Sequence, residues 1–119
     1  MSEPADPKVY TMSEKSAQSM LMNADEHLEI AADLIYDKIA EDPLDMRVVS
    51  YLCDTFSCNY HIRKILKTNL NFNLIDDEKT KEKMVVLNET DIMILENAVL
   101  SFTLTKKELL KLNYSLSLH

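Results

Sequence analysis

Five acidic residues in the first third of the chain stand four apart in one uninterrupted row: Asp25, Glu29, Asp33, Asp37 and Glu41. Carboxylates act in acid–base catalysis as pairs in unlike environments, one of them kept protonated by burial. Residues four apart share one helix surface, so this row presents five similar, solvated carboxylates rather than an unlike pair. We therefore expect no catalytic residues in the row, and no enzymatic activity.

A second group of side chains has the residue types of a zinc site. Asp54, Cys58 and His61 fall on one side of a predicted helix, and His27 would lie level with Cys58 on the helix before it. Zinc accepts carboxylate, thiolate and imidazole ligands in that number. That side of the helix points away from its own apolar residues, whereas His27 stands beside the apolar residues of its helix. The four side chains are not expected to converge, so we predict no metal and no cofactor.

Composition narrows the fold class. The chain has 119 residues, enough for one domain, and it contains no glycine. Tight hairpins and phosphate-binding loops use glycine for positive φ and for close approach of the backbone. The absence of glycine therefore argues against multi-stranded antiparallel sheets, P-loops and dinucleotide-binding turns. The sequence predicts an all-α protein.

Apolar residues recur at helical spacing over three stretches that have recognisable ends. Thr11, which opens a capping-box pattern with Glu14, and Ser13 are equally good N-cap candidates for the first helix. Asp42 and Asn88 are the candidates for the other two, and Pro43 suits a first helical turn. A capping-box pattern that begins at Thr105 leaves open a break of the third helix near Thr103. We predict a flexible N-terminal arm (1–12) and a single domain (13–119), a three-helix bundle of long antiparallel helices at about 13–41, 43–70 and 89–116, with a charged connector at about 73–87.

Each predicted helix has one apolar stripe, which we assign to the core. The assigned core residues are Ala17, Leu21, Ala24, Leu28, Ala31, Ala32, Ile35 and Ile39 in the first helix; Val48, Val49, Leu52, Phe56, Tyr60, Leu66 and Leu70 in the second; and Ile92, Leu95, Ala98, Val99, Phe102, Leu109 and Leu110 in the third.

The acidic row is the best candidate for a binding surface. If the chain folds back near residue 42, Arg47 comes level with Asp37, and Arg63 and Lys64 come level with Asp25, but the middle of the row has no basic partner. Large apolar side chains, Met22 among them, point into the acidic half of this helix, and apolar anchors within a polar rim are typical of interfaces. We predict a small acidic protein that acts as an inhibitor, adaptor or anti-activator by binding a basic or mixed surface of another protein through Asp25, Glu29, Ile30, Asp33, Tyr36 and Asp37.

A second apolar stripe on the third helix lies opposite its predicted core side. Two of the predicted helices carry apolar residues outside their core stripes, so they have more apolar surface than one chain can bury. A symmetric dimer is the commonest assembly that buries such surface. We predict a homodimer with an interface drawn from Leu34, Met93, Leu100 and Leu104.

Two alternative functions remain open. In the first, the carboxylates, about 6 Å apart along the helix axis, imitate DNA phosphates. In the second, residues 91–112 form a degenerate helix-turn-helix whose lysines, Lys106, Lys107 and Lys111, face nucleic acid. The formal net charge of −7 weighs against binding of nucleic acid.

The sequence also predicts a cytoplasmic location. No apolar run reaches the length of a membrane span, and the first residues are acidic and polar, unlike a signal peptide. Cys53 and Cys58 stand five apart on a predicted helix, where their side chains diverge, and two unpaired thiols are typical of a reducing compartment.

Overall fold

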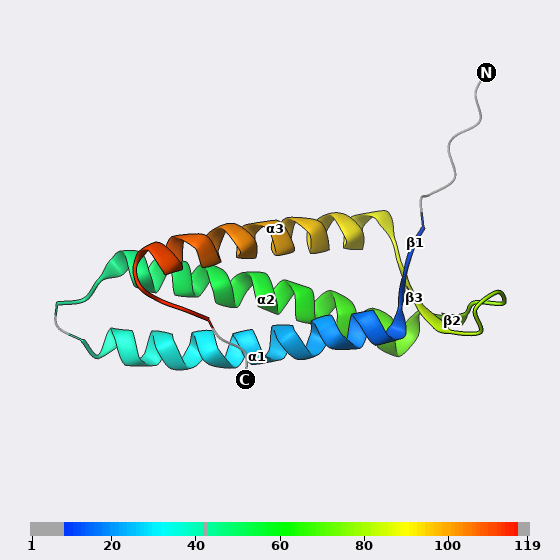
Figure 1. The fold of residues 1–119 in the computed structure, drawn as a ribbon, viewed down its shortest axis with the longest axis horizontal. Coiled ribbons are helices and arrows are strands. Elements are labelled where there is room, and N and C mark those ends of the chain that lie inside the picture. Colours follow the sequence, from blue (N-terminus) through cyan, green and yellow to red (C-terminus); the bar gives the residue numbers. More distant parts are fainter. Residues whose placement is uncertain (1–8, 42, 117–119) are drawn as a thin grey trace, which may run out of the picture.

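The structure is a computed structural model, and it describes residues 9–41 and 43–116. The predicted N-cap Asp42 and most of the predicted N-terminal arm lie outside these residues. The elements in chain order are β1 (Tyr10–Ser13), α1 (Glu14–Ile39), α2 (Met46–Phe72), β2 (Leu74–Asp76), β3 (Lys83–Leu87) and α3 (Glu89–Lys111) (Figure 1).

The described chain is mostly helical, as predicted. Its three helices lie lengthwise beside one another, with α2 between α1 and α3, and the chain reverses direction from each helix to the next (Figure 1). The short strands gather at the end of the molecule where α1 begins, α2 ends and α3 begins (Figure 1). None of the helices in the described ranges is long and apolar enough to cross a membrane.

The three strands form a small antiparallel sheet, and here the all-α prediction is wrong. The strand order is β1-β3-β2, with Met12 opposite Val85 in one pair and Ile75 opposite Met84 in the other. The argument from glycine failed because this sheet needs only one local hairpin. Its loop spans residues 77–82, and Lys81 adopts the required positive φ of 59° without glycine. Part of the predicted arm and much of the predicted connector are therefore strands.

The helix starts follow the capping signals with one correction. The Ser13 hydroxyl accepts a hydrogen bond from the Ser16 amide (3.1 Å), and the Asn88 side chain accepts one from the Asp91 amide (2.7 Å). The second helix begins at Met46 rather than at residue 43, with Asp45 as its N-cap. Asp45 satisfies a free amide of the first turn, which is the role that we gave to Asp42.

The third helix is unbroken past residue 103, and it ends at Lys111 rather than near 116. The amide of Tyr114 donates to the carbonyl of Leu109 (2.9 Å), and the amide of Asn113 donates to the carbonyl of Leu110 (3.0 Å). Asn113 has φ of 66°. This pair of bonds is a Schellman motif, with asparagine at the left-handed position that glycine usually occupies.

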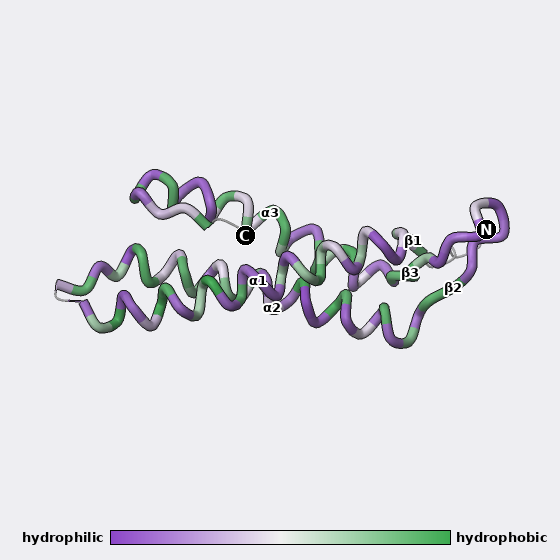
Figure 2. The backbone as a smooth tube through the Cα atoms, turned by 60° about the horizontal axis from the view of Figure 1, so that its bottom comes forward, coloured by the Kyte–Doolittle hydropathy of each residue, from purple (hydrophilic) through white to green (hydrophobic). Residues whose placement is uncertain are grey.

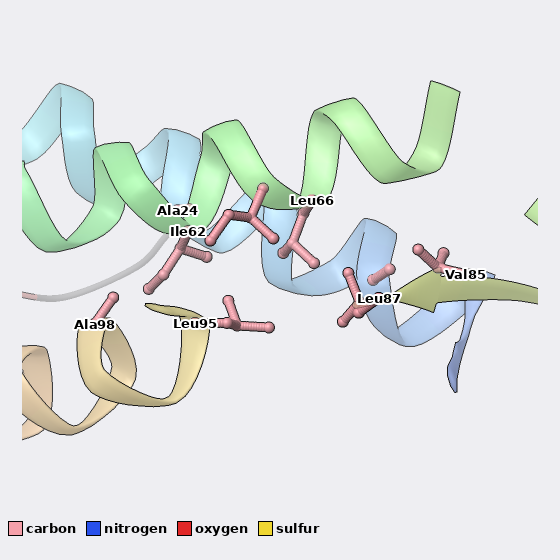
Figure 3. Packing of buried hydrophobic residues seen from close by; sticks show 9 residues of the cluster. Ala24, Ile62, Leu66, Val85, Leu87, Leu95 and Ala98 are labelled. Atoms are coloured by element: carbon pink, nitrogen blue, oxygen red, sulfur yellow. The ribbon is translucent and has the colours of Figure 1, made fainter. Parts of the chain in front are cut away.

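The larger core cluster draws on every helix and on β3 (Figure 3). Val85 and Leu87 of β3 have no exposed surface, so this strand closes the end of the helical core. Alternation of buried and half-exposed side chains along β3 is what a strand covered on one face requires. The nine buried residues are Ala17, Ala24, Ile62, Ile65, Leu66, Val85, Leu87, Leu95 and Ala98.

A second core cluster lies near the other end of the helices. Val48, Leu52 and Leu109 are its buried members, and half-buried side chains of α1 pack against it. The segment after α3 returns over this cluster with Leu112, Tyr114 and Leu116.

Several residues that we assigned to the core lie at the surface instead: Ala32, Ile39, Phe56, Tyr60, Val99 and Leu110. The physical reason is clearest for α2, which packs against α1 on one side and α3 on another. Its buried arc is therefore broad and includes polar residues such as Thr55, Asn59 and Asn69, while Phe56 and Tyr60 of the predicted stripe lie at the surface. Asn59 and Asn69 satisfy their buried amides by donating to backbone carbonyls four residues earlier.

Candidate functional site

The acidic row is exposed, and its middle is unpaired. Asp25 forms an ion pair with Arg63 of α2 (Oδ1 to Nε, 2.8 Å). At the other end, Glu41 pairs with Lys38 (2.9 Å). Among the described residues, Glu29 and Asp33 between them have no ion-pair partner, as expected from the sequence, and all of these carboxylates face solvent.

Two basic residues depart from their predicted positions. Arg47 lies near Asp45 (3.7 Å) at the start of its own helix rather than near Asp37, which also has no ion-pair partner in the described part of the chain. Lys64 makes no ion pair there either, so Arg63 alone links α2 to the row.

The contact between Asp25 and Arg63 fixes which residues of α1 and α2 are level. The two helices run in opposite directions (Figure 1), so each turn forward from Asp25 corresponds to one turn backward from Arg63. Glu29 is therefore level with Tyr60, and Asp33 is level with Phe56. Phe56, Tyr60 and Arg63 follow one another at spacings of four and three, which places them on the same side of α2.

Two aromatic rings that we assigned to the core thus stand beside the acidic row. Phe56 is 39% exposed and Tyr60 is 46% exposed. The surface that results, which we call the acidic–aromatic face, consists of Asp25, Glu29, Asp33, Tyr36, Phe56 and Tyr60. Figure 2 shows that hydrophilic positions recur along α1 beside hydrophobic ones.

This combination of groups is suited to cations that carry an apolar stem. The faces of aromatic rings attract ammonium and guanidinium groups, and a carboxylate at the ring edge adds direct charge attraction. The long methylene stems of lysine and arginine can cover the rings at the same time. The face therefore has the chemistry to bind basic side chains of another protein.

The other predicted binding residues divide into exposed and half-buried ones. Tyr36 is 80% exposed, and Met22 is also well exposed. Ile30 is half-buried. Leu34, which we placed in a dimer interface, is half-buried against the second core cluster and contributes to the fold of the monomer.

A groove follows the seam between α2 and α3 on another side of the molecule. Three hollows of about 310, 420 and 430 Å³ follow one another along this seam. The first shares His61 and Ile94 with the second, and Cys58 with the third. Asp54 lines one end and Asp91 the other. Three of the four metal-site candidates therefore lie along this groove.

The fourth candidate, His27, is buried elsewhere, between α1 and α3. Its ring meets that of Phe102 edge to face, with centroids 4.6 Å apart. In the described part of the chain, no three histidine, cysteine or acidic side chains come close enough to hold a metal ion. Burial, reinforced by the carboxylate of Asp54, raises the pKa of the Cys58 thiol and so disfavours the thiolate that a metal would require.

His27 is packed as a core residue. Its Nδ1 lies 2.7 Å from the carbonyl oxygen of Asn23, and because a carbonyl only accepts, Nδ1 carries the proton. Burial lowers the pKa of His27, and the hydrogen bond to Asn23 opposes this effect in part. The Lys106 ammonium also lies over the Phe102 ring, 4.7 Å from its centroid.

The outward side of α3 carries the remaining predicted residues. Met93, Leu100 and Leu104 are each more than half exposed. The helix that carries them has no turn between residues 91 and 111, so this segment lacks the geometry of a helix-turn-helix.

The residues missed by sequence reasoning are the surface aromatics of α2. Phe56 and Tyr60 are four residues apart, which is also the spacing of core residues in a helix. The one sequence signal that sets this part of the second helix apart is the absence of acidic residues from position 55 to 75. The chain matches no protein family model, no curated protein and no solved structure.

Proposed function

We propose that this chain is a non-enzymatic interaction protein, an inhibitor, adaptor or anti-activator, whose acidic–aromatic face binds a basic segment of another protein. The proposal is supported by the ion pair of Asp25 with Arg63, which puts exposed rings of α2 level with carboxylates of α1 that have no ion-pair partner among the described residues. A helix surface with like charges four apart costs about 0.2–0.5 kcal/mol per pair, and a basic partner relieves that cost.

The rings and the carboxylates contribute differently to such binding. A cation held over an exposed aromatic ring gains about 0.5–1 kcal/mol, and aromatic residues are frequent among the side chains that dominate binding energies. The carboxylates mainly accelerate association and select the charge of the partner. Binding should therefore weaken as salt screens the carboxylates, because the Debye length falls from about 10 Å at 0.1 M to about 3 Å at 1 M.

The decisive experiment is affinity capture from the native host with a charge-reversed face. We expect the double variant Glu29→Lys, Asp33→Lys to lose its partner while it keeps the helical circular dichroism signal of the wild type. The matched control is Glu78→Lys, Glu82→Lys, which makes the same charge change at exposed positions of the β2–β3 loop. Partner capture that survives the first variant, or that is lost equally in the control, would contradict the proposal.

The aromatic contribution is tested with the same captured partner. Tyr60→Ala should weaken binding about tenfold, as expected for an aromatic anchor. The control is Tyr10→Ala, because Tyr10 is an exposed ring of β1 outside the acidic–aromatic face, whereas Phe72 lines the same hollow as Tyr60. Displacement of the partner by duplex DNA would instead support the DNA-mimic alternative.

We also propose that the protein forms a homodimer and resides in the cytoplasm. The exposed apolar side chains of α3 support self-association. The two free cysteines, one exposed and one buried on the same helix, support a reducing compartment.

A further inference from the structure

We propose that two copies of the chain pair antiparallel through the outward side of α3, around a two-fold axis near Leu100. This proposal rests on the proposed self-association and specifies its surface and orientation. It replaces the interface predicted from the sequence, because Leu34 is occupied within the monomer.

The outward side of α3 has an apolar centre. Met93, Leu100 and Leu104 are separated by seven and four residues, so they share one side of the helix. The opposite side packs into the two core clusters through Leu95, Ala98 and Leu109. These three apolar residues are therefore not needed for the core of one chain. Their spacing of seven and four residues is that of the contact positions in a pair of packed helices.

The charges on either side of this centre are self-complementary. On the same outward side, Glu89 and Glu96 precede Leu100, whereas Lys107 and Lys111 follow it. Glu89 and Lys111 are each eleven residues from Leu100. A parallel pair would place acids against acids and lysines against lysines. An antiparallel pair about Leu100 places Glu89 of each copy opposite Lys111 of the other, and Glu96 within one turn of Lys107, which favours this orientation.

The rest of the described chain leaves this side open. In Figure 1, α3 lies at the edge of the molecule with α2 between it and α1. The Schellman motif at Asn113 turns the following segment away, so that Leu112, Tyr114 and Leu116 return over the second core cluster. A second copy can therefore approach α3 along its length, and a two-fold axis gives both copies the same contacts.

The surface is tested by sedimentation velocity over a range of protein concentrations. We expect a dimer for the wild type and at least about tenfold weaker dimerisation for Leu100→Asp. Leu110→Asp is the matched control, because Leu110 is equally exposed (58% against 60%) but lies about a quarter-turn around the helix. A monomeric wild type at high micromolar concentration removes both the homodimer and this arrangement. If Leu100→Asp still forms the dimer, the homodimer stands, but the proposed pairing through α3 is wrong.

The orientation is tested by a charge exchange. Glu89→Lys and Lys111→Glu should each weaken the dimer, because positions 89 and 111 face one another across an antiparallel seam centred on Leu100 and each change places like charges there. The double variant Glu89→Lys, Lys111→Glu should restore dimerisation, because this pair is again opposite in charge. Single variants without effect, or a double variant weaker than both, would overturn the antiparallel pairing.

Cross-linking gives an independent measure of orientation. In a Cys53→Ser background, which removes the exposed native thiol, Leu100→Cys should form a disulfide-linked dimer on mild oxidation, because position 100 faces its own copy at the two-fold axis. Met93→Cys should remain uncross-linked, because its antiparallel neighbour is residue 107. Equal cross-linking at both positions would indicate a parallel pair and refute the proposal.

Discussion

The imidazole of His27 is an ionisable group that the fold holds in its neutral form. His27 is 7% exposed and packs against Phe102, and the ammonium of Lys106 lies over the same Phe102 ring. Burial is the main cause that lowers the pKa of His27 below 6.5, Lys106 adds to the effect, and Asn23 and Glu26 oppose it. Neutral His27 therefore contributes to stability, and protonated His27 does not.

The free energy of unfolding should accordingly fall on mild acidification. As the pH drops below about 6.5, the unfolded chain binds a proton at His27 before the folded chain does. The stabilisation is present above the unfolded pKa and is lost as the pH falls through the lower, folded pKa. Urea unfolding between pH 7.5 and 5 should show a smaller loss of stability for His27→Gln than for the wild type.

The exposed histidine of α2 provides the control for this experiment. His61 is exposed on the surface of the same molecule. His61→Gln makes the same substitution at an exposed position and controls for the effect of the substitution itself. An identical pH profile for His27→Gln and the wild type would show that burial of His27 is not linked to protonation.

At the level of the elements, the end of α3 depends on an asparagine in a left-handed conformation. For most side chains that conformation costs about 1–2 kcal/mol, whereas asparagine and glycine tolerate it. The motif directs residues 112–116 back onto the second core cluster, where Tyr114 also receives the Lys38 ammonium 4.7 Å from its ring centroid.

Substitution at this position should separate backbone conformation from side-chain contacts. Asn113→Val should lower the free energy of unfolding by about 1–2 kcal/mol, because valine disfavours positive φ. Asn113→Gly should change it by less than about 0.5 kcal/mol. Chemical denaturation followed by circular dichroism measures both values. Asn71→Val, at an exposed helical position of α2, is the control, and an equal loss there would assign the effect to helix propensity instead.

The strand β3 is the element that the sequence analysis took for a connector. Its side chains alternate between the core and the outer face, and Val85 and Leu87 are fully buried. A solvated connector would tolerate truncation at any of these positions, whereas a core strand would not.

Truncation along β3 should therefore alternate in cost. Leu87→Ala should lower the free energy of unfolding by about 2–5 kcal/mol, the range found for buried leucine. Val86→Ala, on the half-exposed face, should cost no more than about 1 kcal/mol. The same denaturation measurement applies, and similar small losses at both positions would argue that β3 is not part of the core.

At the scale of the whole molecule, the chain is thin. Its shortest dimension is 21 Å, about two helix diameters. The proposed partner-binding residues lie on α1 and α2, whereas the proposed dimer seam lies on α3; in the view of Figure 1, α1 and α3 lie on opposite sides of α2. The acidic–aromatic face and the proposed dimer seam therefore have no residue in common.

Partner binding and dimerisation should consequently be separable. Leu100→Asp should yield a monomer that still captures the basic partner, and Glu29→Lys, Asp33→Lys should yield a dimer that does not. Sedimentation velocity and affinity capture on the same preparations provide the two readouts. If either variant stayed folded but lost both dimerisation and partner capture, the two activities would depend on a single shared surface, and this prediction would be wrong.

The sequence by itself determined those features that depend on neighbours along the chain. Helix periodicity identified three helices, Ser13 and Asn88 marked two of their starts, and the spacing of four in the acidic row placed Glu29 and Asp33 together on the surface. An N-cap hydrogen bond joins residues that are close in sequence, and residues four apart lie on the same side of a helix. The local sequence pattern is therefore enough to predict both features.

Only the tertiary structure decided what depends on contacts between distant segments. The pairing of β1 with β3 joins residues more than seventy positions apart, and no local signal marks the two as partners. Phe56 and Tyr60 have the spacing of core residues, but α2 is packed from two sides, so its buried arc is set by the positions of α1 and α3. Burial is a property of the assembled fold, and for that reason the aromatic half of the candidate site became visible only when the helices were placed together.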